Sequence, residues 1–148
     1  MFDHEPLISN PEFRREFPDI FKGLGDMNDA TKALFTDKQL TELIKIRASQ
    51  INGCAYCVGV HNKVGLNAGL TQEKIDQIAV WRDSRHFDLR EKIVLALTED
   101  LTRIHTNFPN HEIMEEAKKH FTKNEIILIV TAIANINAWN RLGVGLGF

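Results

Sequence analysis

Residues 42–61 read ELIKIRASQINGCAYCVGVH, and their pattern says more about the fold than any other part of the chain. Its first half carries apolar residues at helical spacing and ends at Asn52, which together with the following glycine is typical of a turn. A second helix is expected to begin at Cys54 and to run to about Ala68, where Gly69 supplies a left-handed stop. The sequence therefore predicts two helices joined by a tight turn, with a Cys-x-x-Cys pair at the N-terminus of the second.

The rest of the chain gives further signals of helices and none of strands. Thr36 followed by Gln39 is typical of a capping box and is expected to start the first of the two helices. Four later helix starts are indicated by potential N-cap residues, namely Thr71, Asp88 with Glu91, Asn110, and Thr122 with Glu125. The pattern predicts an all-α protein of roughly six helices, arranged as a single-domain antiparallel bundle.

The two ends of the chain differ in their patterns. Residues 1–30 are interrupted by prolines and glycines, so we expect short helices wrapped over a main domain of residues 31–148. The last helix, expected from Glu125 to about Leu142, is apolar around much of its circumference. Such a helix lies at the centre of a core or is partly covered by another subunit, and we predict a homo-oligomer.

The composition argues against several classes of function. The chain has 148 residues, of which 43% are hydrophobic, enough to fill one core. Its 18 basic and 20 acidic residues are mixed along the sequence, so no strong positive field is available for nucleic acid. The N-terminus MFDHEPLISN lacks the pattern of a signal peptide, and no stretch of about 18 apolar residues occurs. We expect a soluble, cytoplasmic protein that binds neither nucleic acid nor a membrane.

The two cysteines and one histidine are the residues best placed for chemistry. Residues three and four apart share a helix face, so Cys54, Cys57 and His61 are expected to form one stripe. The spacing of the cysteines is compatible with a reversible disulfide. A thiolate is needed for reaction, and the helix N-terminus favours it at Cys54 whereas a neighbouring imidazole favours it at Cys57. Because an adjacent base gives a directed path for the proton, we predict that Cys57 is the attacking sulfur and that Cys54 is the resolving partner, which closes the disulfide.

Glu42 is a candidate for a proton relay with His61. It lies one turn into the preceding helix, off the apolar stripe that includes Leu40, Leu43 and Ile44. If the turn after Asn52 folds the two helices into a hairpin, Glu42 can approach the cysteine pair.

The run from Glu42 to His61 resembles the core of the AhpD-like family, also called the carboxymuconolactone decarboxylase superfamily. Its alkylhydroperoxidase members carry a glutamate, then Cys-x-x-Cys, then a histidine four residues after the second cysteine. Glu42, Cys54, Cys57 and His61 match that pattern position by position. The similarity continues through AVWRDSRHFDLREKIVLALTEDLT and the closing NINAWNRLGVGLGF, and so covers nearly everything after about residue 30.

The resemblance implies an all-helical antioxidant protein that assembles into dimers, trimers or hexamers. It implies that Cys57 is oxidised by a hydroperoxide to a sulfenic acid, that Cys54 closes the disulfide, and that Glu42 and His61 manage the protons. An external thiol or dithiol would then reduce the disulfide, with no cofactor and no metal. The sequence departs from the best-known subgroup at Tyr56, where that subgroup has a histidine.

Several alternatives remain at this point. The cysteines could be ordinary core residues, or Cys54, Cys57 and His61 could be ligands of a structural zinc ion, which would need a fourth ligand. A lactone or keto-acid enzyme like the carboxymuconolactone decarboxylases could use His61 or Glu42 for a proton, but it would leave the Cys-x-x-Cys pair unexplained. A non-catalytic redox-sensing oligomer would be oxidised reversibly but would consume peroxide slowly.

Overall fold

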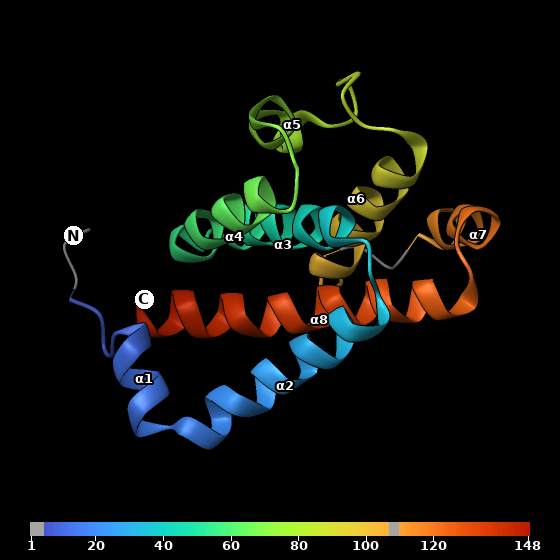
Figure 1. The fold of residues 1–148 in the computed structure, drawn as a ribbon. Coiled ribbons are helices and arrows are strands. Elements are labelled where there is room, and N and C mark those ends of the chain that lie inside the picture. The colour runs from blue at the N-terminus through green and yellow to red at the C-terminus, as the bar shows by residue number, and fades with distance from the viewer. Residues whose placement is uncertain (1–4, 107–109) are drawn as a thin grey trace.

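A computed structural model describes residues 5–106 and 110–148, and its regular structure is helical (Figure 1). The helices are α1 (Asn10–Glu16), α2 (Pro18–Leu34), α3 (Lys38–Asn52), α4 (Ala55–Asn67), α5 (Gln72–Gln77), α6 (Leu89–Thr102), α7 (His111–His120) and α8 (Lys123–Leu146). A 3-10 turn, Ile78–Val80, follows α5. The described residues contain no strand, and the predicted all-α class is confirmed.

The hairpin predicted from residues 42–61 is formed by α3 and α4. The chain reverses after Asn52 because Gly53 adopts a left-handed conformation, with φ 69° and ψ 26°. The backbone N–H of Cys54 donates to the carbonyl oxygen of Ser49 at 3.0 Å, which closes the turn. Cys54 is the N-cap of α4, and the first helical residue is Ala55. The Cys-x-x-Cys pair therefore stands at a helix N-terminus, as the sequence predicts.

The centre of the molecule is occupied by α3. It packs against α4, α6 and α8 (Figure 1), and its side chains are buried around nearly the whole circumference. The core around it is built from fully buried aliphatic side chains, which include Leu43, Ile44, Ile46, Ile78, Leu95, Ile129, Ile133 and Ile136. Two charged residues of α3, Glu42 and Lys45, are also buried, with 2% and 4% of their surfaces exposed. Buried charges need partners, and these two are paired with each other.

The long helix α8 runs along one side of α3 and extends beyond the predicted Glu125 to Leu142. It begins at Lys123, directly after its N-cap Thr122, and continues to Leu146 because the left-handed residue that stops it is Gly147. By length and composition α8 could cross a membrane, with a mean hydropathy of 1.3 over its most apolar segment. In this fold it packs against α2, α3 and α6.

Two predictions for the N-terminal part of the chain are wrong. Residues 1–30 were expected to hold only short helices, but α2 has 17 residues and includes Gly23 and Gly25. Packing of α2 against α8 outweighs the intrinsic cost of about 1 kcal/mol for each glycine. The N-cap of α3 is Asp37 rather than Thr36: its carboxylate accepts a hydrogen bond from Leu40 N–H at 3.0 Å, and a charged acceptor makes the stronger cap.

The remaining predicted helix starts are confirmed. In each case the side chain of the predicted N-cap residue accepts a hydrogen bond from the backbone of the first turn, at Thr71, Asp88, Asn110 and Thr122. The capping boxes that pair Asp88 with Glu91 and Thr122 with Glu125 are both formed.

Candidate active site

Cys54 and Cys57 form a disulfide at the start of α4, with their Cα atoms 5.3 Å apart. Both residues are buried, with 3% and 6% of their surfaces exposed. Cys54 Sγ also accepts a hydrogen bond from the backbone N–H of Cys57 at 3.3 Å, so the first cysteine caps the helix that carries the second. The pair is thus joined to the helix N-terminus both covalently and by a hydrogen bond.

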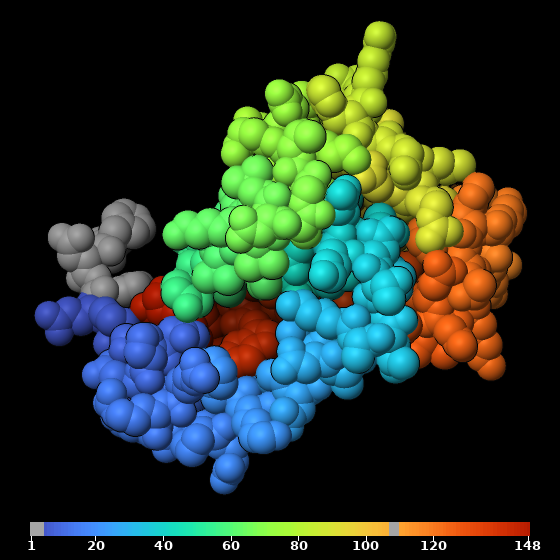
Figure 2. Space-filling view, viewed as in Figure 1, coloured from blue at the N-terminus to red at the C-terminus, as the bar shows by residue number. Residues whose placement is uncertain are grey.

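The two sulfur-bearing residues face different spaces. A hollow opens on the surface between α1–α2 and α4, with α8 at its floor (Figure 2). It corresponds to a cavity of about 300 Å³ whose lining includes Cys57 and His61. Cys54 lines a separate depression of about 200 Å³ beside Gly143 at the end of α8. A molecule in the larger cavity therefore meets Cys57 rather than Cys54.

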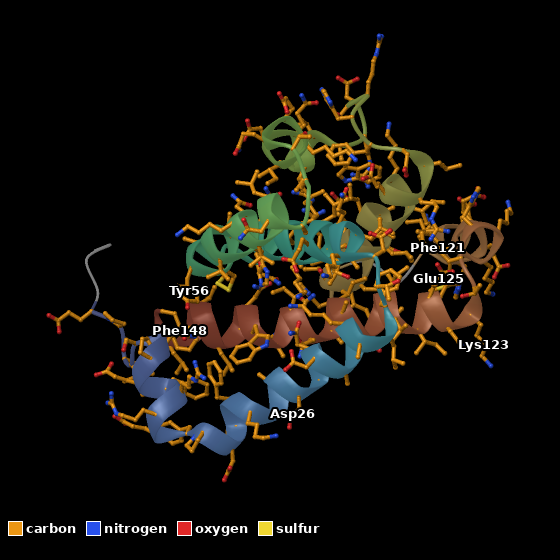
Figure 3. The ribbon with its side chains drawn as sticks, in the orientation of Figure 1. Asp26, Tyr56, Phe121, Lys123, Glu125 and Phe148 are labelled. Carbon is orange, nitrogen blue, oxygen red and sulfur yellow. A yellow bond between two sulfur atoms is a disulfide. The ribbon has the colours of Figure 1, made fainter. Side chains whose placement is uncertain are left out.

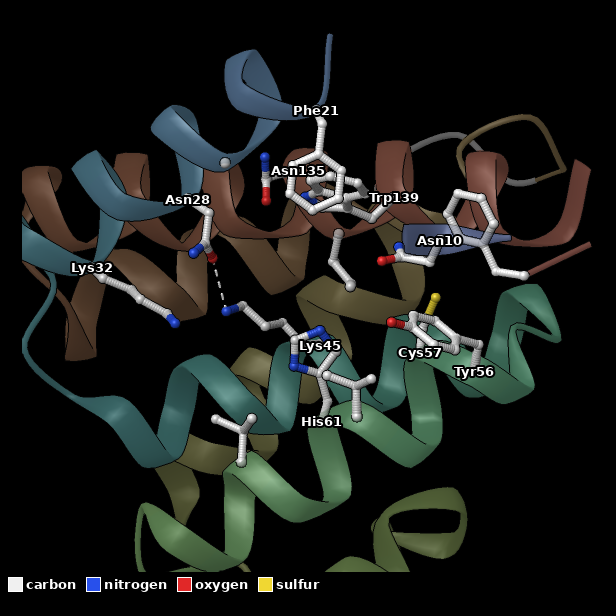
Figure 4. Close-up of a pocket in the computed structure, with 15 residues that line it drawn as sticks. Asn10, Phe21, Asn28, Lys32, Lys45, Tyr56, Cys57, His61, Asn135 and Trp139 are labelled. Carbon is white, nitrogen blue, oxygen red and sulfur yellow. Dashed lines mark hydrogen bonds between the residues drawn. The ribbon is translucent and has the colours of Figure 1, made fainter. Parts of the chain in front are cut away.

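Glu42 and His61 are joined by a hydrogen bond of 2.8 Å between Oε2 and Nδ1, across the α3–α4 hairpin. Burial by itself raises the pKa of Glu42, but the hydrogen bond to His61 and the charge of Lys45 outweigh it and hold this pKa below its usual value. An ionised carboxylate can only accept, so His61 Nδ1 carries the proton and Nε2 is the basic nitrogen. His61 can then take up a proton within the cavity that Cys57 also lines (Figure 4).

Lys45 is a member of this cluster that sequence reasoning missed. Its Nζ lies 3.2 Å from Glu42 Oε1 and donates a hydrogen bond of 2.9 Å to Asn28 Oδ1. Burial is the main cause that lowers the pKa of Lys45, and the charge of Glu42 opposes the shift. The available signal was its spacing: Lys45 follows Glu42 by three residues, so the two side chains share a helix face.

One wall of the cavity comes from α2, most of which falls within the predicted wrapping segment of residues 1–30. Phe21, Gly25, Asn28 and Lys32 all line the cavity. Their spacing of four, three and four residues places them on one face of a helix, a signal that was present in the sequence. The Phe21 ring packs edge-on against Trp139 of α8, with 5.0 Å between ring centroids (Figure 4).

An aromatic pair made by α4 and the C-terminal residue belongs to the same cavity. Tyr56 and Phe148 lie side by side (Figure 3), with ring centroids 6.0 Å apart and the planes near perpendicular. Both residues line the cavity, and Tyr56 is 43% exposed. An aromatic side chain therefore stands at the position where the best-known subgroup has a histidine.

Gly143 brings α8 into contact with the disulfide. A Cβ atom built on this glycine would lie 2.8 Å from Cys54 Sγ and 3.3 Å from Cys57 Sγ. The first distance is closer than side-chain atoms tolerate without a shift, so any larger residue here would push against the sulfurs. Gly143 is a second residue of the site that sequence reasoning missed.

A second buried carboxylate, Glu99 of α6, lies outside the cavity lining and has a structural role. It accepts hydrogen bonds from Arg47 Nε at 2.8 Å, Trp81 Nε1 at 2.9 Å and Arg82 at 2.7 Å. Within the described part of the chain, no three His, Cys, Asp or Glu side chains are arranged to hold a metal ion.

The chain belongs to the carboxymuconolactone decarboxylase family, whose sequence profile matches residues 18–100. The match contains Glu42, the disulfide and His61, and extends into α2, where the sequence resemblance had not reached. The chain is also 32% identical to the uncharacterised protein YdfG of Bacillus subtilis over 130 residues, which is 88% of each sequence.

Two further comparisons concern proteins of the AhpD group. Over 39 residues the chain is 54% identical to the alkyl hydroperoxide reductase AhpD of Mycobacteroides abscessus, which covers 26% of this chain and 22% of that protein. The crystal structure of ATU0492 from Agrobacterium tumefaciens, a protein of unknown function suggested to be the antioxidant defence protein AhpD, superposes with a TM-score of 0.90 at 31% identity, covering 97% of this chain and 96% of that one. The fold is therefore AhpD-like.

The same fold occurs in a protein named for a different activity. The debrominase Bmp8 superposes with a TM-score of 0.78 at 18% identity, covering 89% of this chain and 71% of that chain. At this level of identity the likeness concerns the fold alone.

Proposed function

We propose that the protein is a thiol-dependent peroxidase that reduces hydroperoxides through Cys54 and Cys57, with Glu42 and His61 as its proton relay. The observation that carries the proposal is that Cys57 takes part in the disulfide and also lines the cavity into which His61 faces. A peroxidase of this kind needs a reversible dithiol, space for substrate and a group that moves protons, and these adjoin one another here. The electrons would come from an external thiol or dithiol of the cytoplasm.

In the first step of the proposed reaction, Cys57 is oxidised. Its thiol gives a proton to His61 Nε2, and the thiolate attacks the terminal oxygen of the hydroperoxide ROOH. The O–O bond breaks, the sulfur becomes a sulfenic acid, and the alkoxide takes the proton from the imidazolium and leaves as the alcohol ROH. Glu42, which accepts from Nδ1 at 2.8 Å, stabilises the imidazolium while it exists.

In the second step, Cys54 resolves the sulfenic acid. Its sulfur attacks the Cys57 sulfur, and the displaced hydroxide takes the Cys54 proton to form water, so that the disulfide closes. The Cα distance of 5.3 Å allows this without movement of the backbone. Thiol–disulfide exchange with the external reductant restores both thiols.

The proposal is tested by mixing the fully reduced protein with cumene hydroperoxide. One equivalent of cumyl alcohol should form while two titratable thiols are lost, and intact-mass analysis should show the loss of two hydrogens. With dithiothreitol as reductant the protein should then turn over many times. A reduced protein that consumes no hydroperoxide, or that is oxidised only once over hours, is not a peroxidase; the second result would favour a redox sensor.

Cysteine variants test the order of attack. Because Cys57 lines the cavity and Cys54 does not, Cys54→Ser should form a sulfenic acid at Cys57 that a dimedone probe traps, whereas Cys57→Ser should be almost inert. The opposite pattern would show that Cys54 is the attacking sulfur.

A further inference from the structure

The cavity is lined by two lysines together with many apolar side chains. Lys32 and Lys45 belong to its lining, and among the described residues that line it there is no aspartate or glutamate. Most of the remaining lining is apolar or aromatic and includes Phe21, Val60 and Trp139. The cavity is therefore amphipathic, with a cationic part and an apolar part.

The two lysines approach the same space from different helices. Lys32 comes from α2 and Lys45 from α3, and the ends of their side chains point toward one another in Figure 4. In the same view they lie on one side of the cavity, with Tyr56 and Cys57 on the other and His61 between. A ligand that reached from the lysines to Cys57 would pass His61.

Glu42 is the carboxylate that pairs with both Lys45 and His61. Glu42 pairs with Lys45 through Oε1 at 3.2 Å and with His61 through Oε2 at 2.8 Å. Within residues 5–106 and 110–148, no ion pair to Lys32 occurs alongside them. Among the residues that the structure describes, Lys32 therefore has no carboxylate partner.

The two ammonium groups also act on one another. Burial lowers the pKa of Lys45, and the neighbouring charge of Lys32 lowers it further, against the opposing effect of Glu42. Two acceptors, Asn28 and Glu42, take hydrogen bonds from Lys45 Nζ, whereas an ammonium group has three donors. A bound anion would relieve the repulsion and accept charge-assisted hydrogen bonds.

We propose that Lys32 and Lys45 bind the carboxylate of an amphipathic organic hydroperoxide, whose apolar part lies against the aromatic wall and whose peroxide group reaches Cys57. This inference rests on the proposed peroxidase function and adds a substrate class to it. The site should then prefer a hydroperoxide that carries a free carboxylate over the same hydroperoxide with that carboxylate esterified. The two substrates differ only in the charge at the end far from the peroxide group.

The first test compares two hydroperoxides that differ only in that remote charge. The probes are 4-(2-hydroperoxypropan-2-yl)benzoic acid and its methyl ester, with dithiothreitol as reductant. The kcat/KM for the acid should exceed that for the ester by about fivefold, the factor expected for an ion pair that is partly exposed, and the ratio should fall with added salt. Equal values for acid and ester would overturn the inference while leaving the peroxidase proposal in place.

Matched lysine variants locate the effect. Lys32→Gln should bring the acid-to-ester ratio close to one, since Lys32 is exposed and its removal leaves the buried Glu42–Lys45 pair intact. The control is Lys22→Gln, which removes the same charge from the same helix at a residue paired with Asp26 and outside the cavity lining. A ratio that falls equally in both variants would mean a general effect of net charge and would reject the site.

A binding measurement separates this inference from the proposed function. Calorimetric titration with 4-isopropylbenzoate and with its uncharged amide uses no peroxide and no redox chemistry. The benzoate should bind the wild type more tightly than the amide does, and Lys32→Gln should remove the difference. If the benzoate binds in this way but neither hydroperoxide is reduced, the anion site stands and the peroxidase proposal fails. If benzoate and amide bind alike, the anion site is rejected whatever the kinetics.

Inorganic phosphate in a parallel titration should bind more weakly than the benzoate. Equal binding of phosphate and benzoate would indicate a site for small anions instead.

Discussion

At the level of single residues, the proposed proton relay is a contact between two helices that are adjacent in sequence. Glu42 and His61 are 19 positions apart, and the Gly53 turn brings Glu42 Oε2 within 2.8 Å of His61 Nδ1. The pKa of Glu42 lies below its usual value of 4.5, because the His61 hydrogen bond and Lys45 outweigh burial. The carboxylate is therefore ionised at neutral pH and remains so until the pH falls below that value.

This state of Glu42 predicts the pH dependence of the proposed peroxidase. Since Glu42 stays ionised, the rise of rate between about pH 6 and 9 should report thiolate formation. His61→Ala should react slowly at neutral pH and recover partly at high pH, where the thiolate forms unaided. Glu42→Gln should lower turnover by about 10²-fold to 10⁴-fold, and the double variant should be little worse than the poorer single one.

The measurement is the pH–rate profile of the four proteins with an organic hydroperoxide. Glu99→Gln is a matched control, because Glu99 is also buried and hydrogen-bonded but lies outside the cavity lining. It should lower stability without changing the shape of the profile. Profiles like that of the wild type in both single variants would show that the dithiol reacts without a relay.

The close contact between Gly143 and the disulfide should make the dithiol–disulfide equilibrium sensitive to substitution of this glycine. Gly143→Ala places a Cβ atom 2.8 Å from Cys54 Sγ, and the disulfide holds that sulfur so that it cannot rotate away. The variant should disfavour the disulfide by about 1–3 kcal/mol, the usual cost of overpacking. In glutathione redox buffers its dithiol should be oxidised less fully than that of the wild type.

The control for Gly143→Ala is two residues further along α8. A Cβ atom on Gly145 meets nothing within 4 Å, so Gly145→Ala should leave the dithiol–disulfide equilibrium unchanged. It should also stabilise the helix by up to about 1 kcal/mol through helix propensity. Equal equilibria for the two variants would show that α8 yields to the added methyl group.

At the scale of elements, a buried amide network fastens the end of α3 to α8. Asn52 donates hydrogen bonds to Asn137 at 3.0 Å and to Asn140 at 2.9 Å, and Asn140 in turn donates to Ser49 at 2.9 Å. Asn140 is completely buried. These bonds hold the residues that directly precede Cys54, so they position the start of α4 relative to α8.

Removal of this network should lower the stability of the protein and loosen the position of the start of α4 relative to α8. Asn140→Ala leaves the Asn52 amide and the Ser49 hydroxyl short of a buried partner, which should lower the free energy of unfolding by about 1–3 kcal/mol. Urea denaturation measures the change. Asn67→Ala, at an exposed residue of α4, is the control and should stay within about 0.5 kcal/mol of the wild type.

Elements with local signals could be predicted from the sequence, and those that depend on distant contacts could not. The Asn52 turn and the caps at Asp88 and Thr122 are set by residues within one turn, and all were predicted. The full length of α2 depends on packing against α8, about a hundred residues away, and Gly23 and Gly25 concealed it. Likewise the pattern of Glu42, Cys54, Cys57 and His61 is local, whereas the contact between Gly143 and the sulfurs joins opposite ends of the chain.

At the scale of the whole molecule, assembly into a homo-oligomer stays a prediction. One side of α8 faces away from the core, where an apolar groove of about 430 Å³ is lined by residues that include Leu101, Ile104, Val130, Ala134 and Ala138. A second copy of the chain would cover it. Light scattering should give a mass that is a multiple of 16.9 kDa at micromolar concentration.

A charge placed in the groove tests where the subunits meet. Ala134→Glu should lower the measured mass, because it buries an unpaired carboxylate in the expected interface. Ala33→Glu, at an exposed position of α2 outside the groove, should leave the mass unchanged. A wild-type mass of one subunit would reject the assembly, and an Ala134→Glu protein that keeps its mass would place the interface elsewhere.

The hydrogen bond from Cys57 N–H to Cys54 Sγ, at 3.3 Å, links the redox state of the sulfur to the folding of α4. Oxidised and reduced protein, each folded or unfolded, form a closed thermodynamic cycle of four states. Any difference in unfolding free energy between the two redox forms must therefore equal a difference in reduction potential between the folded and the unfolded protein. The conversion is about 30 mV for each 1.4 kcal/mol. A thiolate at Cys54 is a stronger acceptor for that N–H than a disulfide sulfur, so this cap of α4 stabilises the reduced form of the protein. Thermal melts of the oxidised and the reduced protein therefore measure how far folding shifts the reduction potential of the Cys54–Cys57 pair.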